Sequence, residues 1–211
     1  MFITLEGPEG SGKSSQIPPL KQFLCEQGYD VLATREPGGT SVGEQIRTVL
    51  FNLENTDILP RTEILLFQAA RAQLVDQVIR PHLAKGGVVL CDRYADSTLA
   101  YQGYGYRRNI AEVRAVIEFA TGGLWPELTL LLDVDVQKGL ERRNKEGGVN
   151  RLDTFSLAFY ERVREGYLDL ARQEPQRWVR VDAGQPPARV QEEVREVVLR
   201  RLQGESTSRH S

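Results

Sequence analysis

Gly7-Pro8-Glu9-Gly10-Ser11-Gly12-Lys13-Ser14 is the stretch that decides the fold of this 211-residue chain, because it fits the pattern G-x-x-x-x-G-K-[ST] at every fixed position. It follows an apolar run, residues 2–6, and precedes a segment that can form a helix, which is the context that the motif requires. The alternative, a glycine-rich turn with a chance lysine, leaves the order of strand, loop and helix unexplained. The motif therefore predicts a phosphate-binding loop (P-loop).

Such a loop binds a nucleoside triphosphate mainly through its backbone. Its N–H groups converge on phosphate oxygens, and the positive end of the following helix adds to the attraction. We expect the residues from Gly7 to Ser15 to hold the triphosphate. Lys13 adds a positive charge near the β- and γ-phosphates, and the Ser14 hydroxyl is placed to ligate Mg²⁺.

Short apolar runs alternate with longer helical patterns along the chain. Strands are predicted at residues 2–6, 30–34, 87–91, 127–133 and 177–182. Helices are predicted near residues 13–27, 41–52, 61–84, 96–102, 110–121, 135–145, 153–174 and 186–203. This alternation indicates an α/β fold, a P-loop NTPase-type parallel sheet of five strands with helices on both faces. Ligands should then bind at the carboxyl ends of the strands.

Two prolines fall within the helix that should follow the loop. Each lacks an N–H, and its ring crowds the carbonyl group four residues earlier. Pro18-Pro19 therefore predicts a kink or a locally opened helical turn.

Bulk composition narrows the class of protein. The 27 basic and 29 acidic residues nearly cancel, so we expect small phosphorylated ligands as partners and no nucleic acid. No apolar run approaches membrane-spanning length, and the first strand begins at once, which leaves no room for a signal peptide. We interpret Cys25 and Cys91 as buried free thiols of a cytoplasmic protein. One domain is expected over residues 1–203, followed by a disordered tail over 204–211.

Asp92 and Arg93 come at the end of the third predicted strand. A carboxylate there can reach Mg²⁺ or its waters across the sheet from Ser14. Arg93 stands beside the loop, where a guanidinium binds phosphate oxygens in pairs. Asp92 as a simple cap of the next helix is the alternative.

A helix over residues 61–84 places Phe67 and Arg71 on one face, because they are four residues apart. An aromatic ring beside a guanidinium suits a nucleoside monophosphate, with its base stacked and its phosphate held. Alone, Phe67 could equally be a core residue and Arg71 half of a surface ion pair.

Arg35 and Pro37 belong to a Pro-Gly-Gly turn after the second strand, at the same end of the sheet as the loop. Arg35 can point at an acceptor phosphate from there, although a solvated turn is the simpler interpretation. Further along, a short predicted helix carries polar groups that can read a base edge and an aromatic ring that can pack against a sugar: Ser97, Thr98, Tyr101 and Gln102.

Residues 142–153 form a basic connection broken by glycines. They are either an ordinary solvated loop or a mobile lid that brings arginines onto the transferring phosphoryl group. Glu9, and not an arginine, is the third residue of the P-loop motif, so an arginine acting on that group must come from elsewhere in the chain.

Several classes of P-loop protein fit the sequence poorly. A GTPase needs a guanine-reading Asn-Lys-x-Asp, and the nearest string, Asn144-Lys145-Glu146-Gly147, lacks the aspartate. Large ATPases carry more chain, so the compact size favours a kinase of a small molecule. An ATP-binding switch module remains a second hypothesis, although it would leave the acceptor-side arginines without a role.

Taken together, these motifs resemble the thymidylate kinase family, of bacterial type, within the P-loop nucleoside monophosphate kinases. The resemblance spans Phe2 to about Leu202. It is carried by the segments Leu5–Ser14, Thr34–Thr40, Leu65–Arg71, Asp92–Gln102, Leu131–Asp135 and Val181–Gly184. It implies ATP-dependent phosphorylation of dTMP to dTDP on the route to dTTP, with Mg²⁺, by a homodimer.

The resemblance also implies roles for single residues. Arg35, Arg71 and Arg93 look like a cage for the dTMP phosphate. Phe67 resembles the partner that stacks on thymine, with Ser97 and Thr98 near its edge. Tyr101 would lie beneath deoxyribose and disfavour a 2′-hydroxyl, and Glu9 would contact the acceptor's sugar. Adenine would be flanked by Arg142, Arg143, Asp182, Ala183 and Gly184.

The catalytic set implied for this family is Lys13, Arg93 and an arginine of the lid. We assign that lid arginine to Arg151, and less securely to Arg143 or Lys145, since Glu146–Val149 is less basic than expected for such lids. A kinase for another nucleoside monophosphate or for a deoxynucleoside is the alternative function.

Overall fold

The computed structural model describes residues 1–146, 151 and 155–204. In this part of the chain five strands form one parallel sheet in the order β2-β3-β1-β4-β5. The strands are β1 Phe2–Glu6, β2 Val31–Arg35, β3 Val88–Asp92, β4 Leu128–Asp133 and β5 Trp178–Asp182. The predicted α/β fold is thus confirmed, and each strand lies within one residue of its predicted position. The tail beyond Gly204 lies outside the described residues.

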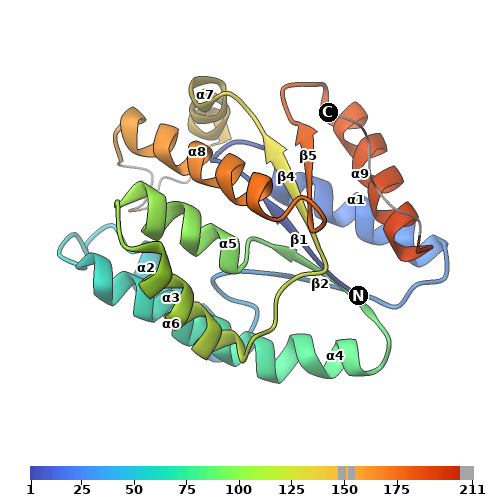
Figure 1. Ribbon diagram of the computed structural model, residues 1–211, viewed down its shortest axis with the longest axis horizontal. Helices are drawn as coiled ribbons and strands as arrows, with labels where there is room; N and C mark the ends of the chain where they lie inside the picture. The colour runs from blue at the N-terminus through green and yellow to red at the C-terminus, as the bar shows by residue number, and fades with distance from the viewer. Residues whose placement is uncertain (147–150, 152–154, 205–211) are drawn as a thin grey trace.

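Helices cover both faces of the sheet (Figure 1). Helix α1 Lys13–Glu26 and helix α9 Pro187–Leu202 pack on one face. The remaining helical elements are α2 Ser41–Phe51, α3 Pro60–Leu74, η1 Val75–Ile79, α4 Arg80–Ala84, α5 Ala95–Thr98, η2 Leu99–Gly105, α6 Ile110–Thr121, α7 Val136–Glu146 and α8 Leu157–Gln173. None of the helices in the described residues is both long and apolar enough to span a membrane.

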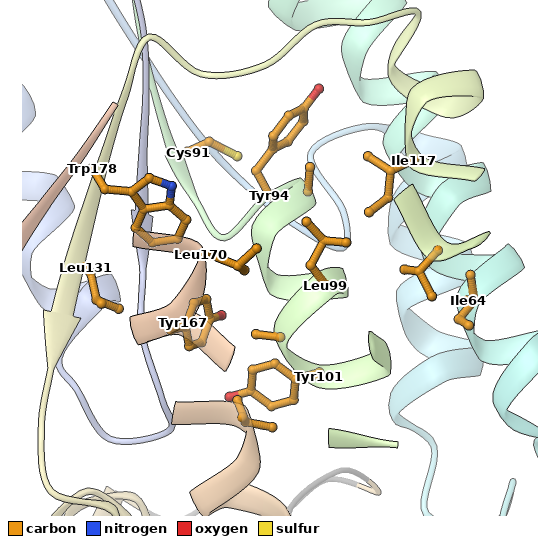
Figure 2. Close-up of a cluster of buried hydrophobic side chains, with 14 of the residues drawn as sticks. Ile64, Cys91, Tyr94, Leu99, Tyr101, Ile117, Leu131, Tyr167, Leu170 and Trp178 are labelled. Carbon is orange, nitrogen blue, oxygen red and sulfur yellow. The ribbon is translucent and has the colours of Figure 1, made fainter. Parts of the chain in front are cut away.

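β1 lies in the centre of the sheet and is buried along its whole length. Side chains of a strand alternate between its faces. Ile3 and Leu5 therefore pack toward α1 and α9, while Phe2 packs into the cluster on the opposite face. Figure 2 shows part of that cluster, with Leu131 and Trp178 from the sheet facing Tyr167 and Leu170 of α8. Burying one such aliphatic side chain contributes about 1.5–3 kcal/mol, so the centre of the sheet is a firm base for the loop that follows β1.

Two helices differ from the patterns that predicted them. The helix predicted over 61–84 changes to a wider π-helical turn at η1 before it continues as α4. Pro81 gives the physical reason, because its ring would crowd the carbonyl of Gln77 in a regular α-helix. The helix predicted over 96–102 likewise passes into the π-helical η2, a kind of turn often found at functional sites.

α1 runs without interruption through Pro18 and Pro19, so no opened turn divides it. Leu20 and Leu24 are fully buried, and this packing holds the helix despite the missing N–H groups. The kink at these prolines stays a prediction. The interpretation of Cys25 as buried is wrong: both cysteines are free thiols, but Cys25 is exposed and only Cys91 is buried.

Candidate active site

The P-loop leaves the end of β1 and enters α1 at Lys13. Gly10 sits in the loop with φ at 66°, in the left-handed region that favours glycine. A Cβ atom at Gly10 would also lie 1.9 Å from the carbonyl oxygen of Gly139 in α7. Only glycine fits there, because the loop touches the backbone of α7 directly.

The Lys13 ammonium group is bound to the loop itself. Nζ donates to the carbonyl oxygens of Gly7 (3.1 Å) and Pro8 (2.9 Å) and to Ser11 Oγ (3.0 Å). Burial, followed by the charge of Arg93, lowers the pKa of Lys13 to about 8. The lysine is thus held at the mouth of the loop, where an incoming phosphate can replace these acceptors.

Ser14 and Asp92, the two predicted Mg²⁺ ligands, contact each other. Ser14 Oγ donates to Asp92 Oδ2 at 2.5 Å. A hydroxyl and one carboxylate oxygen are hard donors of the kind that Mg²⁺ takes, together with waters and substrate phosphates. Among the described residues no group of three His, Cys, Asp or Glu side chains is placed to hold a metal alone. The donor set therefore fits a Mg²⁺ ion that arrives with a nucleotide.

A cavity of about 300 Å³ opens beside the loop. It brings most of the predicted site residues together on one wall or another. Those that line it are Glu9, Gly10, Gly12, Lys13, Ser14, Ser15, Arg35, Pro37, Phe67, Arg71, Asp92, Arg93, Ser97, Thr98, Tyr101, Gln102 and Arg143.

Arg93 stands between the two halves of this cavity. Its Nη1 donates to the carbonyl oxygen of Gly7 at 3.0 Å, and its Nη2 donates to Glu9 Oε1 at 2.8 Å and to Tyr101 OH at 3.2 Å. Tyr101 OH in turn donates to Glu9 Oε1 at 2.8 Å. Burial opposes ionisation of Glu9, but the charges of Arg93 and Lys13 outweigh it and lower the pKa of Glu9 to about 2. Glu9 is therefore an anion at every physiological pH.

Arg71 is the most enclosed of the three predicted cage arginines, with 1 % of its surface exposed. Its Nε and Nη2 bind Glu36 Oε2 at 2.7 and 2.6 Å. Nη1 donates to Gln68 Oε1 (2.7 Å) and Thr98 Oγ1 (3.1 Å), and Nη2 also donates to the carbonyl oxygen of Tyr94 (3.0 Å). These contacts engage all five N–H groups, so a ligand that binds Arg71 must displace one of its acceptors.

Arg35 differs from Arg71 because 54 % of its side chain is exposed. It makes a two-pronged ion pair with Glu44 of α2, both distances being 3.0 Å. An exposed pair of this kind is worth little, so Arg35 can turn toward an incoming anion at low cost.

The predicted base-reading side chains lie along α3, α5 and η2. Phe67 is half-buried and lines the cavity. Gln102 Nε2 donates to Glu63 Oε1 at 2.9 Å, and Thr98 Oγ1 accepts from Gln68 Nε2 at 3.3 Å. The structure thus brings these predicted base-reading side chains together along one cavity.

Of the predicted adenine-flanking residues, only Arg143 lines the cavity. Arg142 Nη1 donates to the carbonyl oxygen of Ala183 at 2.8 Å, which joins α7 to the turn after β5. In that turn the N–H of Gly184 donates to Asp182 Oδ1 at 2.8 Å. Two segments that are distant in the sequence, α7 and the turn after β5, are thus in contact, and both contain residues predicted to bind adenine.

Arg151 does not belong to the residues that line the cavity. Its Nε donates to the carbonyl oxygen of Leu50 at 3.0 Å, and its Nη2 pairs with the buried Glu63. Of the two less secure lid candidates, Arg143 lines the cavity and Lys145 does not. The remainder of the predicted lid, residues 147–150 and 152–154, lies outside the described residues.

Sequence reasoning missed four residues that line the cavity: Glu36, Arg47, Phe51 and Tyr94. Arg47 lies over the ring of Phe51, 4.4 Å from its centroid, and donates to the carbonyl oxygen of Pro37 at 2.9 Å. The two are four residues apart on α2, as Phe67 and Arg71 are on α3. The same spacing argument could have found them.

A P-loop at the centre of a parallel sheet, facing cations across one small cavity, is the arrangement of a nucleotide kinase. Comparison with known proteins narrows this class. The model of the family described as "Thymidylate kinase" matches residues 5–194. This chain therefore belongs to the thymidylate kinase family, which confirms the resemblance seen in its motifs.

Relatives named "Thymidylate kinase" match most of the chain. One from Roseiflexus castenholzii is 48% identical and the match covers 94% of this chain and 92% of that protein. Another, from Desulfovibrio desulfuricans, is 50% identical with 89% of each chain covered. The crystal structure of thymidylate kinase from Ehrlichia chaffeensis superposes with a TM-score of 0.75 at 34% identity, covering 94% of this chain and 98% of that one.

Proposed function

We propose that this protein transfers the γ-phosphoryl group of ATP to dTMP, giving ADP and dTDP for the synthesis of dTTP. Family membership supports this activity, which makes the chain an ATP-dependent phosphotransferase. The observation that carries the proposal is the shared cavity, in which Lys13 of the P-loop faces the acceptor-side residues Arg35, Phe67 and Arg93.

In the reaction an oxygen of the dTMP phosphate forms a bond to the γ-phosphorus, and the bond from that phosphorus to the bridging oxygen of ADP breaks. The acceptor is already an anion, so no strong general base is needed. Catalysis then depends on aligning two polyanions and neutralising their charge. Lys13 would bind the β- and γ-phosphates, and Arg93 would bind the phosphates that meet. Mg²⁺, when held by Ser14 and Asp92, would neutralise charge on the donor phosphates.

The acceptor-side roles follow from the lining of the cavity. Arg35 and Arg71 would complete a cage for the dTMP phosphate with Arg93, and Arg71 would do so by giving up one protein acceptor. Phe67 would stack on thymine. Three polar side chains would contact the edge of the base: Ser97, Thr98 and Gln102. Pro37 also lines this cavity.

Tyr101 and Glu9 would contact the deoxyribose. Their hydrogen bond to each other holds the tyrosine ring in a fixed position. A rigid ring beneath the sugar leaves little room for a 2′-hydroxyl, which favours deoxyribonucleotides. Arg151 is proposed as the lid arginine that reaches the transferring phosphoryl, with Arg143 as the alternative that already lines the cavity.

We also propose a cytoplasmic homodimer. Phe119 of α6 is 91% exposed and Leu65 of α3 is 54% exposed. Helices α3 and α6 pack against each other, and neither side chain lines the cavity, so we place the dimer contact on these two helices. The exposed free thiol of Cys25 supports a reducing compartment. Light scattering of the protein and of Phe119→Glu tests the dimer, which the substitution should split.

A coupled ADP-release assay over dTMP, dUMP, UMP, dCMP and thymidine tests the proposed function. We expect the highest kcat/KM with dTMP and a loss of about 100-fold or more with UMP. UMP lacks the methyl group of thymine and carries an additional 2′-hydroxyl, and both differences should weaken its binding in the transition state. Equal turnover of a ribonucleotide, or turnover of thymidine alone, would contradict it.

A further inference from the structure

Glu6 is a buried carboxylate that the reaction as proposed does not use. It is the last residue of β1, directly before the P-loop, and 0% of its surface is exposed. The alternation of the strand turns it to the same face as Phe2, toward α5 and α8. Burying a carboxylate costs free energy unless hydrogen bonds replace its contacts with water. The hydrogen-bond partners of Glu6 therefore indicate its role.

One oxygen of Glu6 holds the backbone beside Arg93. Arg93 has φ at 64°, a left-handed conformation that residues other than glycine rarely adopt. The peptide groups on both sides of this position are fixed to β1. The N–H of Arg93 donates to the carbonyl oxygen of Leu5 at 3.0 Å, and the N–H of Tyr94 donates to Glu6 Oε1 at 2.7 Å.

The other oxygen of Glu6 holds the groups that carry the guanidinium. Ser97 Oγ donates to Glu6 Oε2 at 2.6 Å, and Tyr167 OH donates to the same oxygen at 2.9 Å. Both hydroxyls accept from Arg93 Nη1, at 3.3 and 3.2 Å. Tyr167 is labelled in Figure 2 beside Tyr101, which accepts from the other terminal nitrogen of Arg93.

We propose that Glu6 is a positioning residue for phosphoryl transfer, whose carboxylate fixes both the backbone turn and the guanidinium of Arg93 through Tyr94, Ser97 and Tyr167. The proposal rests on the proposed function, in which Arg93 binds the reacting phosphates. Glu6 does not line the cavity, so it would act only through Arg93.

The charges around Glu6 make this role depend on pH. It is faced by Arg93 and Tyr94 from the segment after β3, by Asp96 of α5, by Tyr167 of α8 and by Lys13 of α1. Arg71 of α3 and Cys91 of β3 also interact with it electrostatically. Burial, and then the charge of Asp96, raise the pKa of Glu6 from 4.5 to about 7. The carboxylate that anchors Arg93 therefore forms only as the pH passes neutrality.

The same shift has a consequence for stability. A carboxyl group whose pKa is higher in the folded state stabilises the fold fully below its unfolded pKa, and that contribution is lost as the pH rises through the folded value. For Glu6 this loss runs from about pH 4.5 to about pH 7. At pH 8 the fold carries an ionised group that it disfavours, so a neutral residue of the same shape should stabilise the protein while weakening its activity.

Glu6→Gln tests the proposal through the ratio of wild-type to variant kcat/KM for dTMP. Taking this ratio cancels the titration of the substrate phosphates, since both proteins use the same substrates. We expect a ratio near one at pH 5.5, where Glu6 is neutral, and about 10 or more at pH 8, with KM for ATP changed less than about twofold. A ratio near one at every pH would overturn the proposal.

Asp133→Asn is the matched control. Asp133 ends the neighbouring strand β4 and is also buried, but it pairs with Arg164 and Arg180 at the edge of the sheet. We expect Asp133→Asn to lower Tm and to change kcat/KM less than about threefold, and Glu6→Gln to keep or raise Tm at pH 8. A fall in Tm of Glu6→Gln equal to that of the control would assign Glu6 a merely structural role and overturn the proposal. Failure of the proposed function is seen separately, as absence of dTMP-dependent ADP release by the wild type.

Discussion

The two halves of the cavity are built in different ways. The phosphate-binding part of the donor half is one continuous stretch, Gly7–Ser15, in which glycines, backbone groups and a single lysine form most of the binding surface. The acceptor half draws its side chains from the segment after β2, from α2 and α3, and from the segment after β3 through η2. Its cations are already bonded to partners in the protein. A donor site can therefore be specified by a local motif, whereas the acceptor site exists only once the chain has folded.

Arg93→Ala should have the largest effect, because Arg93 is the side chain that touches both halves. We expect kcat to fall about 1,000-fold, since a cation on the transferring phosphoryl group is lost. Arg35→Ala is the comparison: its exposed side chain should mainly bind the acceptor, so KM for dTMP should rise about tenfold with a smaller change in kcat. Steady-state kinetics of both variants measures this. The comparison fails if the two variants lose the same parameter by the same factor.

Removal of a lid arginine should come next. We expect Arg151→Ala to lower kcat at least about a hundredfold with dTMP affinity little altered. Arg143→Ala is the matched variant, because Arg143 already lines the cavity while Arg151 pairs with Glu63. Single-turnover rates separate the chemical step from product release. Unchanged turnover in Arg151→Ala together with a loss in Arg143→Ala would transfer the role to Arg143.

Gly139→Ala should disturb the donor half alone. A Cβ atom at this position would lie 2.3 Å from the carbonyl oxygen of Glu9, so the P-loop must shift away from α7. Misplacing the loop should raise KM for ATP by about tenfold or more, with KM for dTMP changed less. Lys138→Ala, an exposed change on the same helix, is the control and should behave as the wild type. Equal rises in both KM values would show that the halves are coupled through the loop.

Thr40→Ala should have the smallest effect, and on stability more than on activity. Thr40 caps α2, where its Oγ1 accepts from the N–H of Gly43 at 2.9 Å. Loss of such a cap costs about 1 kcal/mol of unfolding free energy. Urea denaturation measures the change, and Thr40→Ser should restore the stability because it keeps the oxygen. If Thr40→Ser restored the stability but bound dTMP more weakly than the wild type, the methyl group of Thr40 would contribute to the structure of the acceptor half.

Much of this architecture could be predicted from the sequence. The strands follow from short apolar runs, and the P-loop from eight adjacent residues, because both signals are local. The contact of Ser14 with Asp92 followed from the rule that the carboxyl ends of parallel strands share one edge of the sheet. The family resemblance named residues of the acceptor half that spacing alone left open, such as Phe67 and Arg71.

The rest depends on partners far away in the chain. No sequence pattern predicts that Glu36 accepts hydrogen bonds from Arg71, or that Glu6 binds the backbone beside Arg93. Each of these contacts forms only when separate strands and helices pack together. The π-helical turns were missed for a similar reason: they replace an α-helix at a few residues, without changing the apolar pattern. Arg47 and Phe51 were within reach of the spacing argument but were not considered.

Binding of a bisubstrate compound tests most directly whether the two halves form one site. Adenosine and thymidine joined by five phosphates should bind at least about 100-fold more tightly than ADP or dTMP alone in calorimetry, because a single cavity makes the second contact intramolecular. It should also displace both nucleotides at a stoichiometry of one per chain. Affinity no better than that of ADP, with dTMP still able to bind, would place the two nucleotides in separate sites and contradict the account.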